Sequence, residues 1–293
     1  LVGYAKRAGL NVILNIHHDG ADSRYWLDIG GAARSRQKDD TVRQTLTALW
    51  TQIARRFRNE GDYLVFESMN EIHDGGWGWG DNLKDGGRQY AVLNGWNQAF
   101  VRAVRATGGC NVRRFLAVPG YVTNIDLTVR HFRLPADTVP RRLMVAVHYY
   151  APMAYTLDGK YSEWGHTASP SRKAPGEDED YMEEQLGAVR AAFTDRGIPA
   201  YIGEMSCMHR TDGRAEKFRL YYLEYLCRAA RECALAPFYW DNGQDRASLF
   251  DRATGQMRPG AREAIGTMRR ALFIQEEGYT LRRVYERSAP PAE

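Results

Sequence analysis

Six short apolar runs recur along the chain, each followed by a polar loop and then by a longer amphipathic segment. Near-continuous apolar runs of this length are typical of parallel strands that are buried on both faces. The pattern therefore predicts six strands, over residues 10–16, 63–69, 114–118, 143–149, 199–203 and 236–240.

Apolar residues at helical spacing lie between several of these runs. The clearest set follows the first run and comprises Val42, Leu46, Leu49, Trp50, Ile53 and Phe57. Residues 90–104 and 218–233 show the same period, and residues 1–8 have the composition of a helix. Strands that alternate with helices indicate βαβ units and a parallel sheet.

Polar side chains collect where the predicted strands end. They are His17 and His18 after the first strand, Asn70 and Glu71 after the second, His148 and Tyr150 at the end of the fourth, Glu204 after the fifth, and Trp240 at the end of the sixth. A TIM (β/α)8 barrel gathers its active site at this face. A doubly wound sheet usually carries a glycine-rich phosphate turn, and no GxGxxG or GxxxxGK[ST] motif follows a strand here. The pattern favours an α/β chain of the TIM-barrel type.

The composition and charge of the chain limit the kinds of partner that it can bind. The chain has 293 residues, of which 44% are hydrophobic and 26% charged, enough for one folded domain. We expect that domain over residues 1–287 and a disordered tail over 288–293. The 40 basic and 36 acidic residues are interspersed, which argues against a nucleic-acid partner. No transmembrane run indicates a membrane partner, and the four cysteines have no zinc-ligand spacing.

Two glutamates are the strongest chemical signal. Glu71 and Glu204 each follow an apolar strand, where a carboxyl is directed to the barrel mouth and partly desolvated. A single glutamate in this position could equally form a loop salt bridge. Hydrolysis of a glycosidic bond needs two carboxyls on opposite sides of the anomeric carbon. Two such residues flanked by His, Asn, Tyr and Trp favour that chemistry.

The segment LVFESMNEIHD (residues 64–74) carries a family resemblance, together with His17-His18, HYY at 148–150, IGE at 202–204 and FYW at 238–240. This set resembles glycoside hydrolase family 5, most closely the bacterial endo-β-1,4-glucanase branch that includes xyloglucanases. The resemblance implies a retaining endo-glycosidase that hydrolyses β-1,4-glucan, with no cofactor and no metal. It also implies a monomer that binds β-glucan polysaccharide or oligosaccharide outside the cell or in the periplasm.

The resemblance implies a role for each matching residue. Glu71 matches the acid/base and Glu204 the nucleophile. Asn70 matches the residue that hydrogen-bonds the sugar 2-hydroxyl. His17 and His18 match histidines of the sugar-binding subsite, and Trp240 matches the aromatic platform beneath the sugar. Tyr150 matches a residue whose hydroxyl lies near the nucleophile, and His148 matches a residue near the acid/base. His18 has an alternative as a supporting or core histidine.

Three further tryptophans lie in predicted loops. Trp26, Trp77 and Trp164 are each expected either to stack on additional sugar units or to pack the loops. The pattern does not choose between these two roles.

The strand count differs from that of the resembled family. In a barrel of eight βα units, that family carries its acid/base after the fourth strand and its nucleophile after the seventh. Here Glu71 follows the second predicted strand and Glu204 the fifth, so both are offset by two. We therefore expect the first two βα units to be absent, which fits a chain that opens with Leu1 inside a helix.

Other functions fit parts of the pattern. The same family includes xyloglucanases and mannanases, and the missing strands would suit a non-catalytic carbohydrate-binding remnant. A metal-dependent hydrolase could use His17, His18 and His148, but adjacent residues on a strand point to opposite faces. A metal site is the least favoured of these alternatives.

Overall fold

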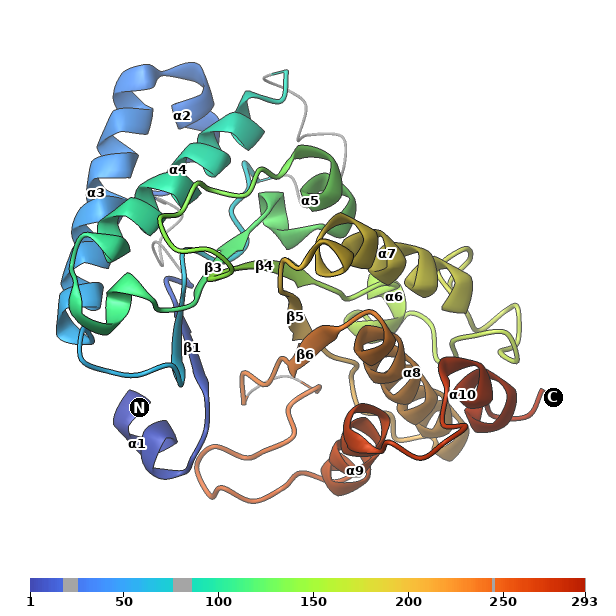
Figure 1. The fold of residues 1–293 in the computed structure, drawn as a ribbon. Coiled ribbons are helices and arrows are strands. Elements are labelled where there is room, and N and C mark those ends of the chain that lie inside the picture. Colours follow the sequence, from blue (N-terminus) through green and yellow to red (C-terminus); the bar gives the residue numbers. More distant parts are fainter. Residues whose placement is uncertain (18–25, 76–85, 244–245, 293) are drawn as a thin grey trace. The chain divides into compact units, whose positions relative to one another are not determined.

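The computed structural model describes residues 1–17, 26–75, 86–243 and 246–292 (Figure 1). The chain forms two compact units. The first comprises Leu1–Val147 with Gly197–Pro199, and the second comprises His148–Arg196 with Ala200–Glu293. The division falls inside the region that the sequence predicts as one catalytic domain.

Six strands form one sheet in chain order. They are β1 (Val12–Asn15), β2 (Leu64–Glu67), β3 (Leu116–Pro119), β4 (Leu143–His148), β5 (Ala200–Met205) and β6 (Leu235–Tyr239). The pairs β1–β2, β2–β3, β3–β4 and β5–β6 are parallel. Parallel neighbours in chain order are the arrangement of a (β/α)8 barrel. The predicted fold class, part of a TIM-type barrel with six strands, is confirmed.

The first unit places its helices around strands β1 to β4. They are α1 (Val2–Arg7), α2 (Ile29–Arg34), α3 (Arg36–Arg56), α4 (Arg88–Arg105) and α5 (Ile125–His131), with short 3-10 turns η2 (Gly109–Val112) and η3 (Tyr121–Thr123). Helix α3 begins after Ser35, whose hydroxyl accepts a hydrogen bond from the backbone N–H of Lys38. Helices α3 and α4 lie side by side in Figure 1.

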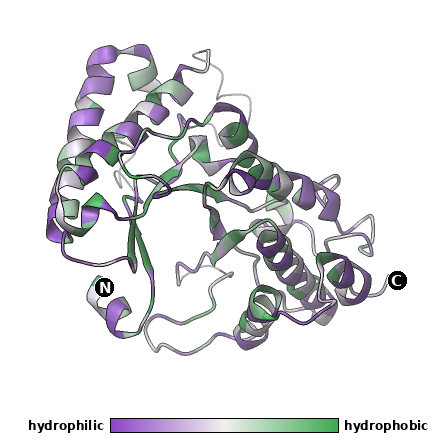
Figure 2. Ribbon diagram, viewed as in Figure 1, coloured by the Kyte–Doolittle hydropathy of each residue, from purple (hydrophilic) through white to green (hydrophobic). Residues whose placement is uncertain are grey.

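Trp50 is the centre of the core in this unit. Its ring is fully buried and lies 5.3 Å from Phe66 of β2 and 4.6 Å from Phe100 of α4. The three rings join α3, the sheet and α4 through a large apolar contact area. Figure 2 shows hydrophobic positions along strands β1 and β4 and hydrophilic positions along much of helices α3 and α8.

A buried arginine ties β3 to the segment before β2. Arg114 is 1% exposed, and its guanidinium donates to the carbonyl oxygens of Phe57, Glu60, Gly61 and Leu64. Burial lowers the pKa of Arg114, but its pKa stays far above neutral. The cation is satisfied by carbonyl dipoles, so it fixes the chain where it turns into β2.

The second unit packs its helices around β5 and β6. They are α6 (Met153–Thr156), α7 (Glu179–Ala192), α8 (Gly213–Glu232), α9 (Ala261–Phe273) and α10 (Leu281–Ser288), with the 3-10 turn η4 (Thr194–Arg196). Asp212 caps α8 by accepting a 2.8 Å hydrogen bond from the N–H of Ala215. Buried residues on α8, among them Phe218, Tyr222 and Leu226, form the centre of this unit.

Three further observations concern the C-terminal end of the chain, the cysteines and the helices. Ser288 is the last residue of α10, and beyond it the carbonyl oxygen of Pro291 accepts a hydrogen bond from Arg214. Cys110, Cys207, Cys227 and Cys233 are free thiols. Among the described residues, no helix combines the length and the apolar composition needed to cross a bilayer.

Candidate active site

A buried polar network supports the segment that follows β2. Trp50 Nε1 donates to the carbonyl oxygen of Ser68, and the Ser68 hydroxyl donates to Asn97 Oδ1 at 2.7 Å. Asn97 Nδ2 then donates to the carbonyl oxygen of Pro119 at the end of β3. Satisfied polar groups in a dry environment allow few alternative arrangements. The network therefore fixes the backbone immediately before Asn70.

Asn70 and His17 come together at the ends of neighbouring strands. Asn70 is 7% exposed, and its Nδ2 lies 3.4 Å from His17 Nε2. Asn15 and Glu67, the last residues of β1 and β2, form a similar pair, in which Asn15 Nδ2 donates to Glu67 Oε2 at 2.9 Å. Glu67 therefore has a structural partner on β1, whereas Asn70 and His17 lie beyond the strand ends, as the sequence predicts for sugar-binding residues.

Glu71 is half-buried and lies beside a strained turn. The hydroxyl of Thr123 is 3.5 Å from Glu71 Oε1, and the N–H of Val122 donates to the carbonyl oxygen of Ile72 at 3.0 Å. Val122 and Thr123 both have positive φ, at 48° and 52°. Such angles are costly for residues with a branched Cβ and persist only where surrounding contacts enforce them. The turn after β3 therefore clamps the segment that carries Glu71.

Tyr121 extends this clamp. Its hydroxyl oxygen accepts a 3.0 Å hydrogen bond from the N–H of Asp74. Burial raises the pKa of Tyr121 well above its usual value, so the hydroxyl remains neutral. Neither Thr123 nor Tyr121 stands out in the sequence, because the strain and the contact both depend on how two loops meet.

In the second unit, Glu204 is held by His148, the last residue of β4, and by Tyr150, which follows that strand. Glu204 is 9% exposed, and the Tyr150 hydroxyl donates to its Oε2 at 2.8 Å. His148 Nδ1 lies 3.6 Å from the same oxygen. The N–H of Tyr149 donates to the carbonyl oxygen of Glu204, so the backbones are paired at this point as well. The contact between Tyr150 and Glu204 is the one that the family resemblance implies.

Gly203 makes room for His148. A Cβ atom at position 203 would lie 3.0 Å from His148 Nε2 and 3.2 Å from its Cδ2. These separations are shorter than ordinary van der Waals contacts, so any larger residue would displace the imidazole. This is a physical reason for glycine immediately before Glu204.

A buried arginine of α8 contacts the segment that follows β5. Arg219 of α8 is 1% exposed, donates from Nε to the carbonyl oxygen of Cys207 at 2.8 Å, and pairs with Glu216 at 2.7 Å. Burial raises the pKa of the Cys207 thiol to about 11, so the thiol stays protonated at neutral pH. Arg219 fixes the chain beyond Glu204, and its helical position gives no signal of that role in the sequence.

Trp240 follows β6 and is half-buried. Its backbone N–H donates to the carbonyl oxygen of Met205 at 2.9 Å. The next residue, Asp241, accepts hydrogen bonds from the N–H groups of Gly243, Leu249 and Phe250. Burial acts to raise the pKa of Asp241, but these hydrogen bonds outweigh it and lower the pKa. Asp241 therefore fixes the backbone immediately after Trp240.

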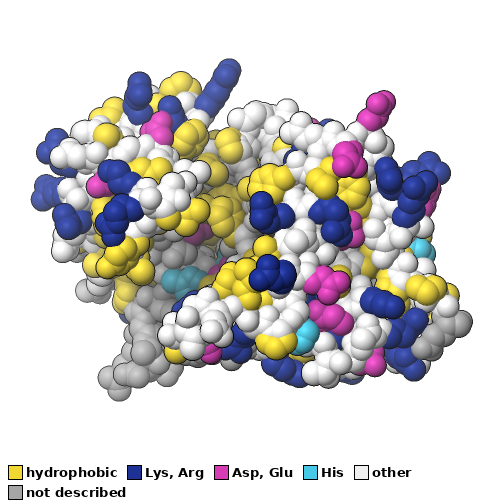
Figure 3. Space-filling model, turned by 90° about the horizontal axis from the view of Figure 1, so that it is seen from below, with side chains coloured by type: hydrophobic (Ala, Val, Ile, Leu, Met, Phe, Trp, Pro, Cys, Tyr) yellow, Lys and Arg dark blue, Asp and Glu magenta, His cyan; other side chains and the backbone are white. Residues whose placement is uncertain are grey.

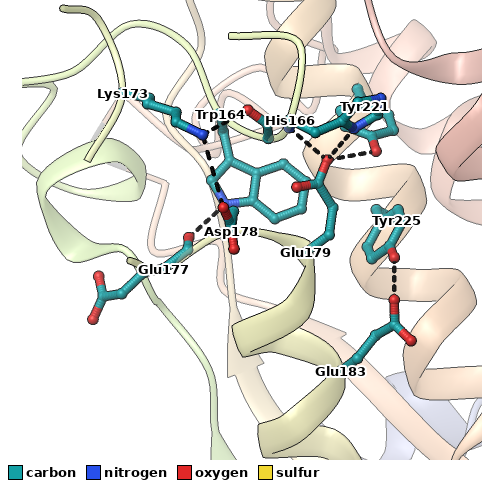
Figure 4. A network of polar contacts seen from close by, with 10 residues as sticks. Trp164, His166, Lys173, Glu177, Asp178, Glu179, Glu183, Tyr221 and Tyr225 are labelled. Carbon is teal, nitrogen blue, oxygen red and sulfur yellow. Dashed lines mark hydrogen bonds and ion pairs between the residues drawn. The ribbon is translucent and has the colours of Figure 1, made fainter. Parts of the chain in front are cut away.

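Trp164 occupies a different environment (Figure 4). It is 2% exposed, its ring lies 5.0 Å from Tyr222 and 5.7 Å from Tyr225, and its Nε1 donates to the carbonyl oxygen of Glu177. Of the two expected roles, this burial favours packing over sugar stacking, because a buried ring has no face left for a ligand. Trp26 is partly buried against the core of the first unit. His18 and Trp77 lie outside the described residues.

One face of the molecule carries charges of both signs. Figure 3 shows Lys and Arg side chains interspersed with Asp and Glu on the face in view. The hydrogen bond from Tyr150 suits a carboxylate that is fixed for attack on a substrate.

Known proteins resemble this chain over most of its length. Residues 1–246 match the sequence profile described as cellulase (glycosyl hydrolase family 5). The chain is 34% identical to endoglucanase A of Paenibacillus barcinonensis, covering 86% of this chain and 66% of that protein. It is 36% identical to the xyloglucan-specific endo-beta-1,4-glucanase BoGH5A of Bacteroides ovatus, covering 85% of this chain and 49% of that protein.

The fold matches a solved structure of the same kind. A GH5-4 broad specificity endoglucanase from Bacteroides salanitronis superposes with a TM-score of 0.89 at 60% identity, covering 93% of this chain and 74% of that one. The chain spans less than two thirds of the length of the two curated relatives. The family match covers well over half of this chain. The chain belongs to the cellulase family, glycosyl hydrolase family 5.

Proposed function

We propose that this chain is a retaining endo-glycosidase that hydrolyses β-1,4-glucans by double displacement. The observation that carries the proposal is the buried carboxylate of Glu204, which Tyr150 holds at 2.8 Å and His148 flanks. A carboxylate fixed in one orientation at the end of a barrel strand suits a nucleophile. Membership of the family supports the same chemistry.

In the proposed reaction, a Glu204 carboxylate oxygen attacks the anomeric carbon and the bond to the leaving sugar breaks. Glu71 gives its proton to the departing oxygen. Glu71 then takes a proton from water, whose oxygen attacks the anomeric carbon and releases Glu204. Thr123 and the strained turn beside it hold the segment of Glu71 in place. Glu71 would act first as an acid and then as a base, so its carboxyl has to stay within hydrogen-bonding reach of the reacting oxygen in both steps.

The remaining predicted residues would bind the sugar. His17 and Asn70 lie close enough to act on one sugar unit, and Asn70 would donate to the 2-hydroxyl. His18 would belong to the same subsite. Trp240 would supply the flat apolar face beneath a pyranose ring. Trp26 and Trp77 stay proposals for outer subsites.

The proposed substrate is a polymer with a β-1,4-linked glucose backbone. The names of two relatives support this class, since one is xyloglucan-specific and another an endoglucanase of broad specificity. Initial rates on carboxymethyl cellulose, mixed-linkage β-glucan, xyloglucan and β-mannan would test it. A preference for mannan would contradict a glucan specificity, and binding of every polymer without turnover would indicate a carbohydrate-binding remnant.

The two glutamates give the sharpest test of the mechanism. Glu204→Ala should abolish turnover of polymers and of activated aryl glycosides, because no nucleophile remains. Glu71→Ala should abolish polymer hydrolysis but retain glycosylation by an aryl glycoside, whose good leaving group needs little protonation. Burst kinetics with a dinitrophenyl cellobioside would separate the two steps. Normal polymer rates in either variant would exclude the assignment.

Stereochemistry provides an independent measurement. Proton NMR of early products should show the β-anomer before mutarotation, since double displacement retains configuration. Full activity in a chelator would exclude the metal-dependent alternative. Early formation of the α-anomer would exclude double displacement.

We also propose an extracellular or periplasmic location and a monomeric state. A glucan polymer is too large to enter a cell, so an enzyme that cleaves it internally has to meet it outside. Light scattering of the purified protein would test the monomer, and fractionation of the producing cells would test the location.

A further inference from the structure

The second unit contains a cavity that the proposed reaction does not use. It has a volume of about 310 Å³ and is lined by residues of α8, α9, α10 and the segment between the last two. Figure 1 shows these helices close together, and α8 contacts both α9 and α10. Helices α9 and α10 lie beyond residue 246, where the family match ends.

Arginines dominate this cavity. Arg270 comes from the last turn of α9, and Arg283 and Arg287 come from α10. Arg283 and Arg287 are four residues apart on one helix face, where two like charges repel each other. Arg283 also lies in the first turn of α10, where the helix dipole disfavours a cation. The turn has no acidic residue of its own, and Glu232 of α8 accepts a hydrogen bond from the N–H of Leu281 at this end of the helix.

The nearby carboxylates do not relieve this repulsion. Glu224 is buried, and its Oε1 accepts a 2.5 Å hydrogen bond from the Tyr279 hydroxyl and lies 3.6 Å from Arg270. Glu276 is the second acidic residue in the lining. Arg283 Nη1 donates to the carbonyl oxygen of Gly278 at 3.5 Å, but among the described residues neither Arg283 nor Arg287 forms an ion pair. The lining therefore contains three arginines and two glutamates.

We propose that this cavity binds a compact oxyanion, either the carboxylate of an acidic sugar or free phosphate. The guanidinium groups of Arg283 and Arg287 would donate paired hydrogen bonds to its oxygens, a geometry for which arginine is well suited. The bound anion would remove the repulsion between them. The volume lies at the lower end of the range of about 300–1,000 Å³ for small-molecule sites, which fits a monosaccharide-sized ligand.

Titration calorimetry with sodium glucuronate, inorganic phosphate and glucose would test the proposal. We expect saturable binding of at least one anion and none of glucose, which has the size of glucuronate but no charge. The affinity should fall at least about tenfold in the double variant Arg283→Gln/Arg287→Gln, and weaken with ionic strength. Tighter binding of glucuronate would identify the acidic sugar as the source, and binding of phosphate alone would identify phosphate.

Arg282→Gln is the matched control. Arg282 lies on the same helix, is paired with Glu286 at 2.8 Å and does not line the cavity, so its replacement should leave affinity unchanged. Arg287→Gln alone, at an exposed position, serves if the double variant is unstable. No saturable binding of either anion, or equal binding by the arginine variants, would overturn the proposal. None of these results depends on glucan hydrolysis, which the arginine variants should retain.

Discussion

Glu204 keeps one orientation because two side chains of a short segment reach the same oxygen. Tyr150 donates a hydrogen bond to Oε2, and His148 lies beside it. Glu204 is largely buried, and a hydrogen bond to a charged group is worth about 1.5–3 kcal/mol. The hydroxyl of Tyr150 therefore has a measurable effect on the nucleophile.

Tyr150→Phe removes that hydroxyl and keeps the ring. We expect kcat/KM on a β-glucan oligosaccharide to fall by about 10- to 150-fold, the range that corresponds to 1.5–3 kcal/mol. Steady-state kinetics would measure it, with circular dichroism to establish that the variant is folded.

Tyr63→Phe is the control for this loss of a hydroxyl. Tyr63 also donates to a carboxylate, Glu60, at 2.6 Å, but this pair lies before β2 and outside the candidate site. Its replacement should leave kcat/KM within about twofold. An equal loss in both variants would show that Tyr150 acts only through stability.

Asp241 makes stability depend on pH. Its pKa in the folded chain is lowered, so it stabilises the fold above its unfolded pKa of about 3.9, and this contribution is lost as the pH falls through the lower folded pKa. Thermal unfolding of the native chain and of Asp241→Asn should differ at pH 6, and the difference should begin to shrink only as the pH falls below about 4. Asp158→Asn, at an exposed position, is the control. A difference that stays constant with pH would contradict this account.

At the scale of elements, the first unit depends on contacts between segments that the sheet brings together. Trp50 joins α3 to β2 and α4, and Arg114 joins the start of β3 to the segment before β2. The arginine satisfies several carbonyl groups that would otherwise be buried without partners. A buried acceptor that loses its partner costs about 1–3 kcal/mol.

Arg114→Met tests this contribution. The apolar stem is largely kept, but the carbonyl groups lose their donor, so the free energy of unfolding should fall by about 3–5 kcal/mol. Urea unfolding followed by tryptophan fluorescence would measure it. Arg113→Met, at the exposed neighbouring position, should change stability by no more than about 0.5 kcal/mol. Similar losses in the two variants would exclude a special role for Arg114.

At the scale of the whole molecule, the chain beyond the family match is part of the fold. Ala264, Met268 and Ala271 of α9 and Val284 of α10 are buried, and both helices contact α8. Helix α8 in turn carries the buried Arg219 that fixes the chain beyond Glu204. The second unit therefore needs α9 and α10 to cover its core.

A chain ending at Gly260 should unfold at a markedly lower temperature or accumulate as aggregate, because the apolar face of α8 would be exposed to water. Thermal unfolding and the soluble yield would measure this. Removal of residues 292–293 alone should change neither. A soluble protein ending at residue 260 with an unchanged melting temperature would show that α9 and α10 are dispensable.

The sequence determined the strands and their ends. Each of the six predicted runs contains a strand or overlaps most of one, because a strand buried on both faces has to be continuously apolar. Helices α3, α4 and α8 follow from their apolar period, whereas α9 and α10 were not predicted. The strand ends also identified the candidates Glu71, Glu204, His148 and Tyr150. The carboxyl ends of parallel strands meet at one face of the sheet, so polar residues there come close to one another.

Tertiary structure decided what each candidate contacts. The strained turn at Val122 and Thr123, the arginines Arg114 and Arg219, and the burial of Trp164 depend on segments that are far apart in the chain. No local pattern encodes such contacts, because they arise from the register of strands and the packing of loops across them. The position of a polar residue at a strand end therefore identifies it as a candidate reacting group from the sequence. The side chains that hold it in place are known only from the folded structure.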